Sequence, residues 1–348
     1  MNNSEPEVDW AVFIPAVIIV LVCAIPLMIF PDSASQILAD GRKIIMTNFL
    51  WLYLIVGIGA FLFCLWLVLG RYAHVKLGAP DESPEYSDMH WVAMMFTTAI
   101  GASVIAWGFA EPIFYLQTPP LGIEVGSTKS FEWAHMYPLL HWGIVPWSMY
   151  ALPAVPIAYM LYVKRYPVLR ISSACDGALP KRGRDQIKTI IDILIVLGIV
   201  GGVATSLGLG VPLLSAMLST LFEVPDSMMI KMSVLSLWTL LFGASVYRGL
   251  KSGIKVLADI NILLAIFAIF FVLIAGPGVF IMDLTVNSIG LMFNNFISTA
   301  TWTDPIENGS FPEDWTGFYW GWWLAYTGMV GLFFGRISRG RTIRQLVL

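Results

Sequence analysis

Eight apolar stretches, each near the length that crosses a lipid bilayer, recur along this chain of 348 residues and constrain its fold more than any other feature. A spanning helix needs about 20 mostly apolar residues, and its backbone must satisfy its own hydrogen bonds. The stretches cover residues 10–30, 49–70, 89–117, 135–163, 187–221, 232–247, 254–282 and 315–335. The pattern predicts an all-α, polytopic helical membrane protein.

Composition points the same way. Hydrophobic residues make up 57 % of the chain and charged residues only 12 %, whereas soluble domains usually have about 25 % charged residues. A water-soluble core could not bury so much apolar surface. The three cysteines, Cys23, Cys64 and Cys175, lack the spacing of a disulfide framework or a zinc site. The apolar stretches carry no nucleophile–base pair and no metal-ligating cluster, so we expect neither an intramembrane enzyme nor a cofactor, and no nucleic-acid partner.

The distribution of basic residues predicts the orientation. Sixteen of the 20 Lys and Arg residues follow the second, fourth, sixth and eighth stretches, while Arg42, Lys43, Lys129 and Lys231 lie in the opposite set of loops. Basic loops stay in the cytoplasm. We therefore expect the N-terminus and residue 348 on the cytoplasmic side of the cell membrane. The acidic N-terminus has no basic leader region, so no cleaved signal peptide is expected.

One segment between stretches, 283–314, has no Lys or Arg but five acidic residues. We interpret it as an external loop. Within it, "LMFNNFISTATW" at 291–302 could form an amphipathic helix on the outer membrane surface. An ordinary loop is the alternative interpretation.

The last apolar stretch is unusually aromatic: residues 314–331 read "DWTGFYWGWWLAYTGMVG". In a helix, Tyr319, Trp322, Trp323 and Tyr326 share one face at the spacing i, i+3, i+4 and i+7. An interfacial belt explains Trp315 but not Tyr326, which lies about 16 Å further along the helix, near the bilayer centre. The face either packs against other helices or contacts a ligand.

A second aromatic group lies in the fourth stretch, where Trp142, Trp147 and Tyr150 fall within nine residues. Prolines bend membrane helices, so a bend at Pro146 would bring Trp147 toward the face of Trp142 and Tyr150. Aromatic groups on two spans could form one cage. Such a cage suits a quaternary ammonium group, which donates no hydrogen bonds and is held by cation–π attraction.

Small residues fill the third stretch, "TTAIGASVIAWGFAEP" at 97–112. Close helix packing is one interpretation, and a broken helix that exposes backbone groups to an ion or substrate is the other. Gly328 and Gly331 interrupt the eighth stretch, five helices later, as an inverted five-helix repeat would predict. Glu111, a carboxylate within a span, is a candidate for a proton relay, although a structural hydrogen-bonded role is favoured.

At these residues the chain resembles the betaine/carnitine/choline transporter family. The matching stretches occur in the family's order and extend over most of the chain. They are "WGFAEP" (107–112), "HWGIVPWSMYAL" (141–152), "ATSLGLG" (204–210), "GLKSGIKVLADINILLA" (249–265), "DWTGFYWGWW" (314–323) and "GRISRGRTIR" (335–344). The resemblance implies a LeuT-like fold of two inverted five-helix repeats, a bilayer location, a small quaternary ammonium substrate and a homotrimer.

The resemblance also implies a division of the chain. Residues 1–88 would form two peripheral helices, 89–282 the first repeat, 283–314 the external loop, and 315–348 the first helix of the second repeat with the start of a cytoplasmic helix. Since this is about 8 of 12 family spans, an incomplete gene product is expected. The predicted function is secondary transport of carnitine, glycine betaine, choline or a relative by alternating access. The alternative is a non-transporting remnant or an osmosensor.

The resemblance carries the family's substrate site over to particular residues of this chain. They are Trp142, Trp147, Tyr150 and Trp323, with Trp322 and Tyr326 nearby, and Gly101, the surviving glycine of the family's glycine motif.

The positions that bind sodium in sodium-coupled family members are mostly changed here. That glycine motif, Gly-Met-Gly-Ile-Gly, is replaced by "AIGAS" at 99–103, two threonines by Ile199 and Val203, and Ser-Pro-Phe by "TGM" at 327–329. These changes favour exchange without a coupling ion, as in the carnitine/γ-butyrobetaine exchangers. Asn261 is an argument against this, because those exchangers carry Arg there.

Overall fold

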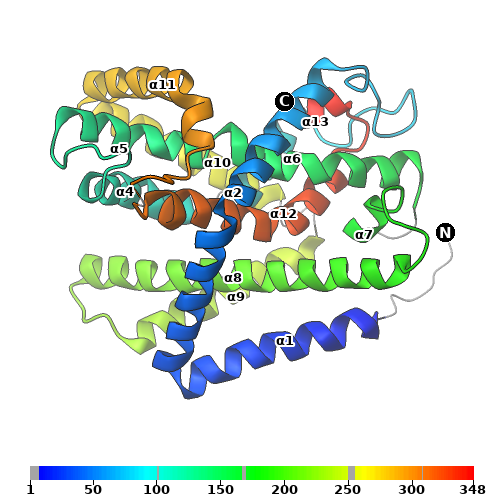
Figure 1. Ribbon diagram of the computed structural model, residues 1–348, viewed down its shortest axis with the longest axis horizontal. Coiled ribbons are helices and arrows are strands. Elements are labelled where there is room, and N and C mark those ends of the chain that lie inside the picture. Colours follow the sequence, from blue (N-terminus) through cyan, green and yellow to red (C-terminus); the bar gives the residue numbers. More distant parts are fainter. Residues whose placement is uncertain (1–7, 100–101, 167–169, 250–254, 308) are drawn as a thin grey trace. The chain divides into compact units, whose positions relative to one another are not determined.

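The computed structural model describes residues 8–99, 102–166, 170–249, 255–307 and 309–348. Most of these residues are helical, and none of them forms a β-strand (Figure 1). The elements, in chain order, are α1 (Trp10–Ile29), α2 (Pro31–Leu69), α3 (Asp88–Ala99), α4 (Ala102–Gln117), α5 (Thr128–His141), α6 (Ile144–Ala158), the π-helical turn η1 (Tyr159–Val163), α7 (Ile171–Ala174), α8 (Arg184–Phe222), α9 (Met228–Gly249), α10 (Lys255–Ala275), α11 (Gly278–Ala300), the π-helical turn η3 (Pro312–Gly317), α12 (Phe318–Ile337) and α13 (Ile343–Val347).

Seven helical segments within the described residues are long and apolar enough to cross a membrane. They are Trp10–Ile29, Pro31–Leu69, Thr128–Val163, Arg184–Phe222, Met228–Tyr247, Val256–Ala275 and Gly278–Ala300. Six of the eight predicted stretches coincide with members of this set. Large apolar side chains such as Leu240 and Phe267 are exposed along these helices, as expected of surfaces that face lipid rather than water. The prediction of an all-α, polytopic helical membrane protein is confirmed.

Two predicted spans, 89–117 and 315–335, are helical but do not belong to that set. In the first, α3 and α4 are each too short. In the second, α12 is long enough, but its tryptophans, tyrosines and glycines lower its mean hydropathy. Conversely, α11 belongs to the set and occupies much of the predicted external segment 283–314, so most of that segment is helix. The expected amphipathic helix 291–302 is the last part of α11, which ends at Ala300.

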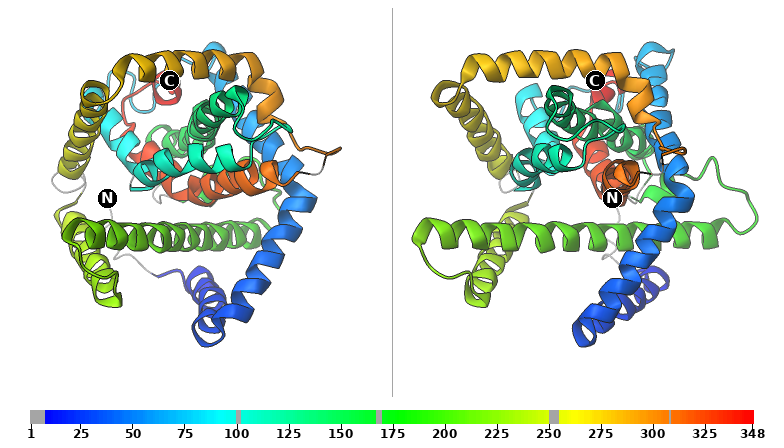
Figure 2. Two further views of the ribbon diagram at one scale, coloured as in Figure 1. Left: turned by 90° about the vertical axis from the view of Figure 1, so that its left-hand side faces the viewer. Right: turned by 60° about the vertical axis from the view of Figure 1, so that its left-hand side comes forward.

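A sharp corner separates α10 from α11 (Figure 2, yellow to gold). The helix ends at Ala275 because Pro277 has no N–H to donate and also disfavours helical backbone at Gly276 before it. The chain then restarts as a helix at Gly278. The predicted extension of the seventh span to residue 282 is therefore wrong.

The fourth predicted span is interrupted at Trp142 and Gly143, between α5 and α6. Pro146 accounts for the interruption: its ring would clash with the carbonyl of residue 142 in a continuous helix, and it cannot donate a hydrogen bond. The interruption lies where the sequence predicted a proline-induced bend. It places Trp142 at the end of α5 and Trp147 on α6.

The described chain divides into two compact units. The first comprises residues 1–83, 144–202 and 300–348, and the second comprises 84–143 and 203–299. In the first unit α12 lies alongside α6, and α2 packs on both (Figure 1). Its core includes the wholly buried Trp320 and Tyr319. A Cβ at Gly57 of α2 would lie 2.7 Å from Trp320 Nε1, so only glycine lets α2 approach this ring closely. In the second unit α3 packs on α10, and α4 on α5.

The segment "GRISRGRTIR" at 335–344 begins in the last turn of α12 and docks against the chain beyond α2. Leu77 exchanges backbone hydrogen bonds with it, donating to the Arg341 carbonyl at 2.8 Å and accepting from Gly340 at 2.8 Å. Gly340 has φ +79°, which glycine adopts without strain. Arg339 also forms an ion pair with Glu82. These contacts give the segment a structural role in the first unit.

Candidate functional site

Four aromatic rings from α6 and α12 meet in the first unit, and we call them the aromatic cluster: Trp147, Tyr150, Trp323 and Phe334. The ring centroids of Tyr150 and Trp323 are 4.6 Å apart, and those of Trp147 and Trp323 are 6.1 Å apart. Phe334 lies 6.3 Å from both Trp147 and Tyr150. These separations are typical of rings in direct contact.

Helical periodicity accounts for the cluster. Trp147 and Tyr150 are three residues apart on α6, and Trp323 and Phe334 are eleven apart on α12, which is close to three full turns. Phe334 was not predicted as part of the site. Extending the aromatic face of α12 by the same period beyond Tyr326 would have found it.

The cluster is closed in this structure. Tyr150 and Trp323 are only 4 % and 3 % exposed, and Phe334 is 1 % exposed, whereas Trp147 is partly exposed. A cation–π contact needs the cation over a ring face, within about 6 Å of the centroid. Rings 4.6 Å apart leave no space between them for a trimethylammonium group. The arrangement shown here is therefore a packed one, and a ligand head enters among these rings only if they separate.

Other residues of the predicted face of α12 have their own surroundings. The ring of Trp322 lies 5.7 Å from that of Phe318 and 6.2 Å from that of Tyr319, in a second aromatic group. Tyr326 lies against α8, where a Cβ at Gly202 would come within 2.8 Å of its ring. The residues of the predicted face thus lie on one helix, but they do not share one set of neighbouring residues.

Trp142 belongs to the second unit, where its indole N–H donates to Glu111 Oε1 at 2.6 Å. The Tyr115 hydroxyl donates to Glu111 Oε2 at 3.1 Å and pairs with His141 Nδ1 at 2.8 Å. Glu111, Tyr115 and His141 are wholly buried. A buried carboxylate that accepts two hydrogen bonds is well satisfied, which favours the structural role of Glu111 over a proton relay. A role for Trp142 in the substrate site stays a prediction.

The sequence predicted that glycines interrupt two helices, and the structure bears on the two predictions differently. Gly328 and Gly331 do not interrupt α12, which is continuous from Phe318 to Ile337, so that prediction is wrong. A Cβ at Gly331 would lie 2.8 Å from Pro153 Cγ, which identifies it as a site of close packing on α6. Gly101, in the other interruption, lies outside the described residues, and its predicted role stays a prediction.

Three of the positions that the family resemblance equates with sodium ligands lack a side-chain oxygen. Hard cations prefer oxygen ligands, and the side chains of Ile199, Val203 and Met329 contain none. Asn261 on α10 instead donates from Nδ2 to Thr97 Oγ1 on α3 over 3.5 Å, within the second unit.

Comparison with known families gives a match over almost the whole chain. A sequence model described as "BCCT, betaine/carnitine/choline family transporter" matches residues 11–348. The matched range includes both compact units, apart from residues 1–10, and all four residues of the aromatic cluster.

Proposed function

Since the chain belongs to the betaine/carnitine/choline transporter family, we propose that it carries a zwitterionic quaternary ammonium compound, such as carnitine or a betaine, by sodium-independent exchange. The observation that carries this proposal is the meeting of Trp147 and Tyr150 with Trp323 in one aromatic cluster. Three predicted site residues from segments far apart in sequence contribute to it. Aromatic faces are the chemistry by which proteins hold trimethylammonium groups.

The closed state of the cluster fits transport by alternating access. Substrate binding requires the rings to separate, and a carrier that opens to one side at a time must change conformation around its site. Trp147 is the ring with partial exposure, so we expect it to meet the ligand first. All four side chains are neutral, which favours a zwitterion over choline, because a lone cation would gain from a nearby carboxylate.

We expect transport to continue at a similar rate when sodium is replaced by potassium. The reason is the absence of side-chain oxygens at Ile199, Val203 and Met329. The measurement is uptake of labelled carnitine by the purified full-length protein in liposomes, with and without internal carnitine or γ-butyrobetaine. Exchange predicts that uptake is fast only in preloaded liposomes, in either salt.

Two outcomes of that assay would contradict the proposal. Uptake that collapses without sodium would show that other groups bind the ion, and exchange without a coupling ion would be wrong. No uptake of any quaternary ammonium compound, by protein shown to be folded, would favour the non-transporting alternative.

The basic loops lead us to propose that Arg182, between α7 and α8, lies in the cytoplasm. A cysteine introduced at Arg182 in a chain whose native cysteines are replaced should resist a membrane-impermeant thiol reagent in intact cells and react after permeabilisation. Lys129 at the start of α5 is the matched control, because it is also exposed and belongs to the opposite set of loops. If Arg182→Cys reacts from outside and Lys129→Cys does not, the orientation is reversed.

A further inference from the structure

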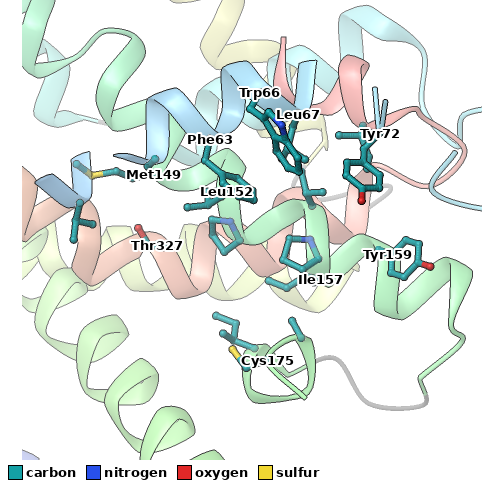
Figure 3. A pocket seen from close by; sticks show the side chains of 18 of the residues that line it. Phe63, Trp66, Leu67, Tyr72, Met149, Leu152, Ile157, Tyr159, Cys175 and Thr327 are labelled. Carbon is teal, nitrogen blue, oxygen red and sulfur yellow. The ribbon is translucent and has the colours of Figure 1, made fainter. Parts of the chain in front are cut away.

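A largely apolar cavity of about 760 Å³ lies in the first unit, lined by residues of α2, α6, α7 and α12 and the turns beside them (Figure 3). This volume is in the range of small-molecule and cofactor sites, which are usually apolar clefts with a few polar groups. Phe63 and Trp66 of α2 line it and remain about half exposed, at 48 % and 49 %. The aromatic cluster does not line the cavity, so it is separate from the proposed transport site.

The cavity has two unlike ends. In Figure 3, Tyr72 and Tyr159 lie toward one end of the labelled side chains, and Met149 and Thr327 lie toward the other. Tyrosines are enriched where a membrane protein meets the lipid headgroups, because the ring is apolar and the hydroxyl is polar. The end with the two tyrosines is therefore the end suited to the membrane interface.

Each of these tyrosines has a basic residue beside it. The Arg71 guanidinium lies 4.9 Å from the ring centroid of Tyr72 and donates to its hydroxyl at 2.8 Å. Lys164 Nζ lies 5.9 Å from the ring centroid of Tyr159. Both cations are exposed, and neither has an acidic partner within the described part of the chain. By contrast, Arg339 is neutralised by Glu82.

We propose that this cavity binds one anionic phospholipid, with an acyl chain against the apolar lining and the phosphate near Arg71 and Lys164. The lining suits a hydrocarbon chain, since burial of CH₂ groups is favourable and needs no polar partners. The two cations, which have no acidic partner among the described residues, suit an anionic headgroup. Both cations also belong to the loops that the basic-residue pattern assigns to the cytoplasmic side, where anionic lipid is abundant.

The test is native mass spectrometry of the purified full-length protein, titrated with phosphatidylglycerol or phosphatidylcholine of identical acyl chains. We expect one high-affinity site that prefers phosphatidylglycerol roughly tenfold, since each cation near the surface adds attraction for anionic lipid. The double variant Arg71→Gln/Lys164→Gln should lose this preference but still bind lipid weakly. Ala174→Phe, which fills the cavity from α7, should weaken the binding of both lipids.

A matched control is Lys181→Gln/Arg182→Gln, which removes the same charge from exposed positions that neither line the cavity nor contact its tyrosines. It should keep the preference. All variants are first checked for wild-type melting behaviour. The proposal is overturned if the control lowers the preference as much as Arg71→Gln/Lys164→Gln does, or if folded Ala174→Phe binds lipid like the wild type. Absence of bound lipid on the folded wild type would also overturn it.

Discussion

Leucine in place of Trp323 is expected to weaken the binding of carnitine and betaine roughly tenfold or more, and phenylalanine is expected to cause a smaller loss. A desolvated cation–π contact contributes about 2 kcal/mol, and every 1.4 kcal/mol is a factor of ten in affinity. Phenylalanine keeps a weaker aromatic face, whereas leucine keeps bulk and apolarity but has none. The measurement is equilibrium binding to purified full-length protein, normalised to folded protein.

The normalisation matters because Trp323 is also a packing residue. It is 3 % exposed and in contact with Tyr150 and Trp147, so Trp323→Leu should lower the folded yield whether or not the ring binds substrate. Only the affinity of the folded fraction separates the two roles. Trp315→Leu, in η3, is the control and should change affinity little. Equal affinities of the wild type and Trp323→Leu would mean that the cluster only packs.

Alanine at Gly331 is expected to destabilise the protein by about 1–3 kcal/mol, the usual cost of overpacking a close contact. The new Cβ would lie 2.8 Å from Cγ and 3.1 Å from Cβ of Pro153, whose ring cannot rotate away. The cost should exceed the gain of up to about 1 kcal/mol that alanine brings to a helix interior. The measurement is the melting temperature of the purified protein, together with its folded yield.

Gly321→Ala, on the same helix, is the matched control for this prediction. A Cβ there would meet Tyr53 Cε1 at 3.6 Å, an ordinary van der Waals contact, so its melting temperature should stay or rise. If Gly331 instead marked an interruption of the helix, as the sequence suggested, Gly331→Ala would melt like the control and transport more slowly. That result would contradict the close packing of α12 on α6.

The sequence alone identifies a helical membrane protein, because the interactions that decide this class lie within short segments of the chain. Runs of about 20 apolar residues predict helices, since only a helix satisfies its own backbone in lipid. Ends of helices were harder to predict. α2 begins at Pro31, well before the apolar run 49–70, because polar turns can continue a helix outside the membrane. Prolines are an exception, because a proline interrupts a helix through its own chemistry. The helix breaks near Pro146 and Pro277 can therefore be explained from the sequence.

In the candidate site, too, some features could be predicted from the sequence and others only from the tertiary structure. The clustering of aromatic residues in two spans and the family resemblance singled out Trp147, Tyr150 and Trp323. Helical periodicity placed Trp323 on an aromatic face, because 3.6 residues per turn fix which side chains share a face. Only the tertiary structure decided that these rings touch one another, that Phe334 joins them, and that Tyr326 lies against Gly202. The reason is that distances between helices depend on pairs of residues far apart in the chain. Gly331 against Pro153 lets α12 approach α6 closely, and that approach closes the aromatic cluster.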